Sequence, residues 1–255
     1  RLQAEDDWTD HLESQICVAV GRMGYGEPTK VYQAQPSFRY ANLSATLRFS
    51  WDEKKVDLYF RRIHVYNNKP VLYINGEIGS FTMDEEPTTT TSAYQLYGKL
   101  RLMLRQQIYL GVGGQLDYLL EGGFVFGSVP YPLLTIFDAN QTFAYDKYRF
   151  SLMQNYRYAA DKYLSLHVDW NGRGCLFNLI PGVRCLHLRE LAIFKLGYGD
   201  LSSRHESVLP LPYSRSGARR LDELSTPYVE MGVGIGNILR VGEVYSIWQL
   251  THRDD

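Results

Sequence analysis

The chain has 255 residues and a mass of 29.4 kDa, enough for one large β domain or two small domains. Its hydrophobic content of 45% supports a sizeable core and excludes a disordered chain. Twenty-seven basic and 28 acidic residues give a net charge of -1, so the strong positive field that a nucleic-acid partner requires is absent. No run approaches the ~18 consecutive apolar residues of a membrane-spanning helix.

Alternation of apolar and polar residues dominates the chain and predicts an all-β fold. The alternating segments are residues 15–23, 43–52, 55–66, 72–78, 94–105, 148–153, 163–170, 229–236 and 241–252. Helical periodicity is limited to one expected turn at residues 5–14. A strand with its connection uses about 20 to 25 residues in a membrane barrel, which predicts about eleven strands here.

Residues 94–105 show the alternation most clearly. Leu100 and Leu102 lie on one face of the expected strand, and Lys99, Arg101 and Arg105 lie on the other. Such a strand separates an apolar environment from an aqueous one.

A soluble sandwich or a lipocalin-like barrel shows the same alternation, so the pattern alone leaves both open. Two features favour a transmembrane barrel. Charged side chains alternate inside strands, where a water-filled lumen solvates them and a packed core does not. Aromatic residues end many strands, as at membrane interfaces: Trp51, Tyr66, Tyr94, Tyr118, Tyr148, Trp170, Tyr228 and Trp248. We therefore predict a single antiparallel transmembrane β-barrel domain over residues 1–255.

The charged side chains of these rows are the candidate lumen lining. They are Lys99, Arg101, Arg105, Arg149, Arg157, Glu190 and Glu230. An open channel with this lining favours anions. The favoured alternative is a closed lumen in which arginines pair across strands, with Glu190 and Glu230 as partners. The oily loop at residues 129–142 is expected to pack against the barrel wall or to fold inside it.

No hydrolase elbow, metalloprotease helix or phosphate-binding loop occurs in the sequence. Gly232, Gly234 and Gly236 lie in an alternating strand, where they are expected to let a bulky neighbour approach the lumen wall. An acid–base or metal site could be assembled from His187, Arg189, Glu190, His205 and Glu206. Because the two histidines lie at opposite ends of one strand, we predict no catalytic, metal or cofactor site.

Three cysteines, Cys17, Cys175 and Cys185, match no metal-ligand spacing. We interpret them as small core residues. A disulfide between Cys175 and Cys185 stays open at this point.

Several motifs of the second half occur in a fixed order. They are residues 94–127, Val129-Pro130-Tyr131-Pro132-Leu133-Leu134, residues 145–153, residues 161–166, Asn178-Leu179-Ile180-Pro181, Leu188-Arg189-Glu190 and residues 227–235. In this order they resemble the C-terminal barrel of a large family of uncharacterised Bacteroidota outer-membrane proteins with an N-terminal carboxypeptidase-regulatory-like domain. The resemblance covers residues 94–253 by motif and the first ninety residues by strand pattern only.

The resemblance implies a bacterial outer-membrane location, with membrane lipid and other envelope proteins as partners and no nucleic acid. The implied function is non-enzymatic, in transport across the outer membrane or in its assembly and scaffolding, without a cofactor. Two alternatives stay open: a soluble all-β binding or scaffold domain and, less favoured, a barrel-borne hydrolase. The regulatory-like domain and the usual terminal strand are missing, so we expect a fragment, truncated at both ends, of a barrel with twelve or more strands.

Strand counting also predicts an orientation. Residues 201–227 are expected to be a surface loop and residues 237–240 a tight periplasmic turn. The same count leaves residues 129–142 and 172–186 together on the periplasmic side, where long connections are unusual.

Overall fold

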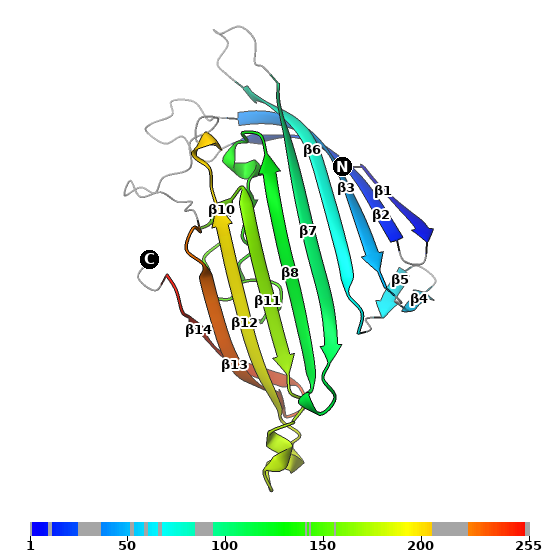
Figure 1. Ribbon diagram of the computed structural model, residues 1–255, viewed down its shortest axis with the longest axis vertical. Helices are drawn as coiled ribbons and strands as arrows, with labels where there is room; N and C mark the ends of the chain where they lie inside the picture. The colour runs from blue at the N-terminus through cyan, green and yellow to red at the C-terminus, as the bar shows by residue number, and fades with distance from the viewer. Residues whose placement is uncertain are drawn as a thin grey trace.

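The computed structural model describes residues 2–9, 12–24, 37–51, 54–58, 61–65, 68–84, 94–140, 142, 144–155, 157–205 and 224–252. Its elements are β-strands and short 3-10 turns, and the described residues contain no α-helix. Ten strands form one antiparallel sheet in the order β1-β2-β3-β6-β7-β8-β11-β12-β13-β14 (Figure 1). The predicted all-β, antiparallel fold is therefore confirmed.

The ten strands of the sheet vary from eight to fifteen residues. They are β1 (Leu2–Thr9), β2 (Leu12–Gly24), β3 (Ser37–Ser50), β6 (Val71–Asp84), β7 (Gln95–Tyr109), β8 (Gln115–Phe126), β11 (Lys162–Asn171), β12 (Arg189–Asp200), β13 (Tyr228–Ile238) and β14 (Gly242–Gln249). Two small pairs lie outside the sheet: β4 (Lys54–Leu58) with β5 (Arg61–Val65), and β9 (Thr135–Ile136) with β10 (Ala159–Ala160). The 3-10 turns are η1 (Gly111–Gly113), η2 (Tyr131–Leu133), η3 (Phe177–Leu179), η4 (Arg184–Leu186) and η5 (Ser203–His205).

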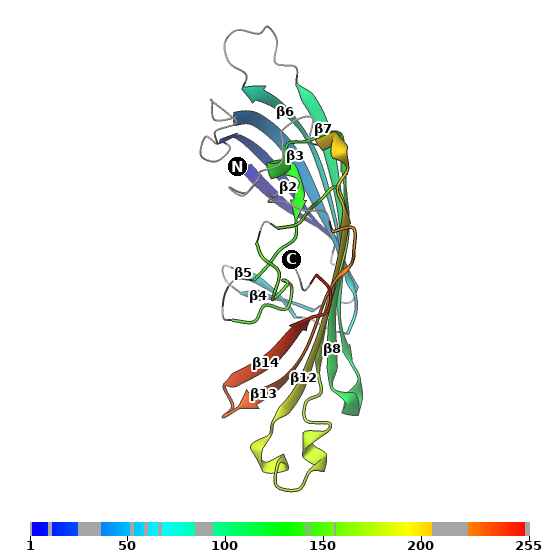
Figure 2. The same cartoon turned by 90° about the vertical axis from the view of Figure 1, so that its left-hand side faces the viewer.

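The sheet is strongly curved, as Figure 2 shows from the side. Within the described residues, β1 pairs only with β2 and β14 only with β13, so the two edge strands do not meet. No helix in this part of the chain is long and apolar enough to cross a membrane.

The two faces of the sheet differ in chemistry because side chains alternate along each strand. On the convex face the side chains are apolar and exposed: Val18, Leu43, Ile78, Leu96, Leu100, Leu102, Leu120, Phe126, Leu164, Tyr198, Val233 and Trp248. On the concave face the alternate positions carry polar, charged and aromatic side chains, many of them buried. Residues 94–105 divide as predicted, with the leucines on the convex face.

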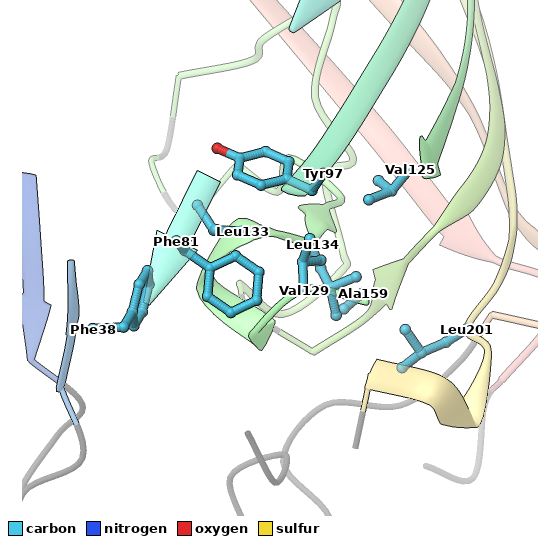
Figure 3. Packing of buried hydrophobic residues seen from close by; sticks show 9 residues of the cluster. All are labelled: Phe38, Phe81, Tyr97, Val125, Val129, Leu133, Leu134, Ala159 and Leu201. Carbon is cyan, nitrogen blue, oxygen red and sulfur yellow. The ribbon is translucent and has the colours of Figure 1, made fainter. Parts of the chain in front are cut away.

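The concave face is covered by residues 127–161, which connect β8 to β11 and are called the covering segment here (Figure 2). Two apolar clusters hold it against the sheet. One joins Phe38, Phe81, Tyr97 and Val125 of the strands to Val129, Leu133, Leu134, Ala159 and Leu201 (Figure 3). The other is formed by Phe137, Ala139, Phe150, Met153, Tyr158, Ala160, Leu224 and Tyr228. Residues 129–142 were expected to pack against a barrel wall or to fold inside it, and the described ones pack on the concave face of the sheet.

Three predicted segments differ in the structure. Residues 148–153 are part of the covering segment, where Phe150 makes an isolated bridge to Ala139 instead of joining the sheet. The helical turn expected at residues 5–14 is the β1–β2 hairpin, whose backbone groups are satisfied by strand pairing. Residues 55–66 contain two short strands, β4 and β5, instead of one.

Relative to the earlier strands, the later strands run in the opposite direction to the prediction, because the strand predicted at residues 148–153 is absent from the sheet. Without it, β11 starts at the same end of the sheet at which β8 finishes. Residues 129–142 therefore lie at the same end as the loop that begins at residue 201, and residues 172–186 lie at the opposite end. The prediction that put both segments at one end is wrong. The described residues do not include Tyr66 or residues 206–223, among which is Glu206.

The tight turn predicted at residues 237–240 is confirmed. Asn237, Leu239 and Arg240 adopt left-handed backbone angles, with φ of 63°, 51° and 67°. The turn joins β13 to β14 at the same end as residues 172–186.

Candidate functional site

The candidate site is the polar interior between the concave face and the covering segment. Two cations of β7 pair with carboxylates of the neighbouring strands. Lys99 Nζ lies 3.4 Å from Glu77 Oε1, and Arg101 Nε donates to Glu121 Oε1 at 2.7 Å. The Tyr163 hydroxyl also donates to Glu121, at 2.7 Å. The expected cross-strand pairing of basic and acidic side chains occurs here, with Glu77 and Glu121 as the acids.

Arg105, the third cation of this row, lies under the covering segment. Its guanidinium carbon is 4.6 Å from the centre of the Tyr148 ring, a cation–π distance. Lys147 Nζ donates to Asp117 Oδ2 at 2.8 Å and makes a second link from the segment to the sheet. Arg105 of β7 and Asp117 of β8 therefore both contact the covering segment.

Arg149 and Arg157 do not lie on strands of the sheet. Both belong to the covering segment, residues 127–161. Arg149 Nε lies 3.5 Å from Asp146 Oδ2, with a side chain 54% exposed. The Arg157 guanidinium is 5.4 Å from the centre of the Tyr158 ring.

Lys195 is a buried cation that the sequence analysis missed. It lies on β12 with no exposed surface. Its Nζ donates to the carbonyl oxygen of Asp146 at 2.9 Å, to the carbonyl oxygen of Arg149, and to Ser151 Oγ at 3.1 Å. All three acceptors belong to the covering segment. A signal for it existed in the sequence, since Lys195 follows the apolar residues Leu191 and Ile193 at alternate positions of one strand.

Glu230 stands directly opposite Lys195, on β13, and is equally buried. Its carboxylate accepts the backbone N–H groups of Ser151 and Leu152, each at 2.8 Å, and the Tyr228 hydroxyl at 2.8 Å. Its partners are therefore two N–H groups and a phenol instead of the arginines that we expected.

Tyr145 completes this contact between segment and wall. Its hydroxyl donates to Asp169 Oδ1 at 2.6 Å, and its ring stacks on Tyr245 with centres 4.4 Å apart. Lys195 Nζ lies 4.5 Å from the centre of the Tyr145 ring. Burial first, and then the negative charge of Asp169, raise the pKa of Tyr145 well above its ordinary value, so its phenol remains a hydrogen-bond donor.

A second anchor lies where the covering segment joins β11. Asp161 Oδ2 accepts from Ser202 Oγ at 2.6 Å and from Arg204 Nη2 at 2.9 Å, and lies 3.2 Å from His205 Nε2. The N–H of Val129 donates to His205 Nδ1 at 3.1 Å. Burial alone raises the pKa of Asp161, but the hydrogen bonds from Ser202 and His205 and the charges of His205 and Arg204 lower it overall.

This cluster contains a serine, a histidine and an aspartate, but not in a catalytic order. The Ser202 hydroxyl donates to the carboxylate of Asp161, whereas nucleophile activation requires a histidine to take the hydroxyl proton. His205 Nδ1 is occupied by a backbone N–H of the covering segment. The arrangement is suited to holding the segment in place.

Glu190 lies away from the interior rows, at the end of the sheet near residues 172–188. Its carboxylate accepts the N–H groups of Gly174 and Leu176, each at 2.9 Å, and also that of Phe177. Glu190 thus fixes a loop instead of pairing with a lumen arginine.

The part of the chain that the structure describes holds no group of three potential metal ligands. Cys175 and Cys185 are both free thiols.

The glycines of β13 act as the sequence analysis predicted. A Cβ at Gly232 would lie 2.9 Å from Ile193 Cγ1, and one at Gly234 would lie 2.8 Å from Tyr245 Cδ1. Because glycine has no side chain, Ile193 and Tyr245 can approach the backbone of β13 closely.

Comparison with protein families gives a match over most of the chain. Residues 27–204 match the model of the C-terminal domain of DUF5686, a family of unknown function. No curated protein matches the chain. The family match covers more than half of the sequence and ends before β13. The chain therefore belongs to the DUF5686 C-terminal-domain family.

Proposed function

We propose that this protein is a non-enzymatic transmembrane β-barrel of the Bacteroidota outer membrane, with a lumen closed by the covering segment. The observation that carries the proposal is the convex face of the sheet. Val20, Ile78 and Leu96 there are 74%, 70% and 76% exposed. An exposed apolar surface that runs across successive strands is unfavourable in water, and it is the surface that a membrane barrel presents to lipid.

Strand length supports the same proposal. A tilted membrane strand needs about 9 to 11 residues, and β3, β6 and β7 have 14, 14 and 15. In lipid an open sheet edge would leave N–H and C=O groups without partners. We therefore propose that β1 and β14 are joined in the membrane, directly or through further strands.

The state of the lumen decides what the barrel does. Five charged residues of the concave face pair with carboxylates or bind the covering segment, which argues against a permanently open anion channel: Lys99, Arg101, Arg105, Lys195 and Glu230. We propose assembly or scaffolding work in the outer membrane, or transport that requires the segment to move. The ordered motifs of residues 94–253 support the envelope location and an N-terminal regulatory-like domain in the whole protein.

The membrane location is tested by solubility and by one pair of substitutions. We expect the folded chain to need detergent and its gel band to shift on boiling. Leu102 points outward and is 45% exposed, so Leu102→Arg should reduce folding into vesicles, at a cost of about 2–4 kcal/mol near the bilayer centre. Thr46, on the concave side, provides the control Thr46→Arg, which we expect to fold better. A monodisperse folded chain without detergent would overturn the proposal.

The closed lumen is tested by conductance in planar bilayers. We expect small or no steps from the unmodified chain. Large stable steps that fall when Arg101 and Arg105 are both changed to Glu would instead identify an open anion channel.

A further inference from the structure

A pocket of about 390 Å³ opens at the end of the sheet that carries the β13–β14 turn. Its walls come from the loop of residues 172–188, which contains η3 and η4, and from the turn at residues 237–241. Figure 2 shows both segments at the lower end of the sheet. The polar side chains that line the pocket are Arg173, Asn178, His187, Arg189, Asn237 and Arg240. None of them belongs to the interior under the covering segment.

The pocket is built by contacts between its two walls. Asn237 Nδ2 donates to the carbonyl oxygen of His187 at 2.7 Å and ties the turn to the loop. Arg173, His187 and Arg240 have positive φ angles of 53°, 51° and 67°, as Asn237 does. L-residues rarely adopt this conformation, and it persists where surrounding contacts hold it. The backbone that carries these lining side chains is therefore held in place.

Among the described residues, no carboxylate forms an ion pair with the arginines of the pocket. Within the described residues, the guanidinium groups of Arg189 and Arg240 make no hydrogen bond or ion pair. Arg173 Nη2 donates to a neutral acceptor, Gln115 Oε1, at 2.6 Å. The adjacent Glu190 carboxylate is occupied by three backbone N–H groups. Three guanidinium groups around one pocket attract an anion, and their planar forks match the oxygens of a phosphate.

Exposed apolar residues are the chain neighbours of residues that line the pocket. Leu239 and Val241 flank Arg240 in the turn and are 90% and 91% exposed, and Leu179 and Leu186 of the loop are 76% and 59% exposed. Apolar side chains beside the pocket do not stabilise an inorganic anion, whereas they can bury part of the acyl chains of a lipid. We infer that this pocket binds the phosphate group of an anionic lipid headgroup at the membrane surface. The choice of a lipid over free phosphate rests on the proposed membrane location.

Binding is tested on the full chain in an uncharged, phosphate-free detergent by isothermal titration calorimetry. The probes are dihexanoyl phosphatidate, dihexanoyl phosphatidylcholine and inorganic phosphate. The test variant is the double substitution Arg189→Gln and Arg240→Gln. The control is Arg184→Gln: Arg184 is exposed in the same loop but does not line the pocket. Circular dichroism and the gel shift on boiling show that each variant is folded.

We expect saturable binding of phosphatidate, at least tenfold weaker in the double variant and unchanged in Arg184→Gln. Inorganic phosphate should compete, with lower affinity, and phosphatidylcholine should bind more weakly than phosphatidate. Equal affinity for inorganic phosphate would overturn the lipid assignment. No saturable binding, or an equal loss in Arg184→Gln, would overturn the pocket itself.

The two proposals fail separately. Dihexanoyl lipids bind as monomers, so the titration does not require insertion into a bilayer. A chain that inserts into vesicles but binds no phosphate contradicts this inference alone. A chain that binds phosphate yet stays monodisperse without detergent contradicts the membrane location and, with it, the lipid as the source of the phosphate.

Discussion

Lys195 and Glu230 stand opposite each other on β12 and β13, and each binds the covering segment through a different kind of backbone group. Lys195 donates to carbonyl oxygens of residues 146 and 149, and Glu230 accepts the N–H groups of residues 151 and 152. Both side chains are fully buried. The pair is neutral as a whole, which offsets part of the cost of burying each charge.

Replacing Lys195 with Met should strongly destabilise the folded chain. The substitution leaves the carbonyl oxygens of Asp146 and Arg149 without their donor and the Glu230 carboxylate without its counter-charge, a loss of about 3–5 kcal/mol. Urea unfolding in detergent measures it. The control is Lys147→Met, which removes a half-exposed ion pair with Asp117 and should cost less than about 1 kcal/mol. Equal effects of the two substitutions would contradict this account.

Removing both charges should be less harmful than removing one. In the double variant Lys195→Met with Glu230→Gln, no uncompensated buried charge remains. We expect the double variant to be more stable than Lys195→Met alone, which a double-mutant cycle measures by the same urea titration. Strict additivity of the two single losses would show that the charges do not compensate each other.

Gly197 should not tolerate a side chain, because the covering segment packs directly on it. A Cβ there would lie 2.9 Å from Phe150 Cζ and 3.4 Å from Leu224 Cδ2. Gly197→Val should therefore destabilise the chain by roughly 1–3 kcal/mol and speed hydrogen exchange in the covering segment. Gly76 has no atom within 4 Å of its ideal Cβ position, so Gly76→Val is the matched control and should be close to neutral.

Acid should weaken the anchor at Asp161. Burial alone raises the folded-state pKa of this carboxyl. The hydrogen bonds and charges of Ser202, His205 and Arg204 outweigh burial and lower the pKa overall. Its stabilisation is therefore fully present above the unfolded pKa of about 4 and is lost as the pH falls through the folded value. Urea midpoints between about pH 7 and pH 2 should converge for the unmodified chain and Asp161→Asn. A constant difference between them over that range would show that Asp161 does not titrate on unfolding.

Cysteine labelling checks the orientation of the proposed barrel. Cys185 is exposed at the end that carries the β13–β14 turn, and the loop of residues 201–227 begins at the other end. Barrels place their short turns in the periplasm. On intact cells, an impermeant maleimide should label Ser214→Cys in a Cys185→Ser background and spare Cys185 of the unmodified chain. The reverse pattern would invert the orientation.

The pattern of the sequence was sufficient for the sheet because alternation is a local property. Leu100 and Leu102 fall on the convex face and Lys99 and Arg101 on the concave face, as two-residue periodicity requires. Residues 148–153 alternate in the same way, but the N–H groups of Ser151 and Leu152 bond to Glu230, 79 and 78 positions away. A local pattern carries no information about such a partner, so Arg149 was assigned to a strand that does not exist.

The candidate site could be predicted only in part for the same reason. The cations of β7 were predicted from their own strand, and their acids, Glu77 and Glu121, come from the two neighbouring strands. The roles of Lys195 and Asp161 depend on the path of residues 127–161 across the sheet, which tertiary packing determines.

The position of these anchors in the chain has a consequence for the order of folding. The covering segment precedes β11, but Lys195, Glu230, Ser202 and His205 all follow it in the sequence. During synthesis and early pairing the segment has no wall contact from these residues, and the long loops that bring them together are closed late. We therefore expect these four anchors to form only after β12 and β13 are in register, whereas the contacts of the segment with Phe38, Phe81 and Tyr97 can form earlier.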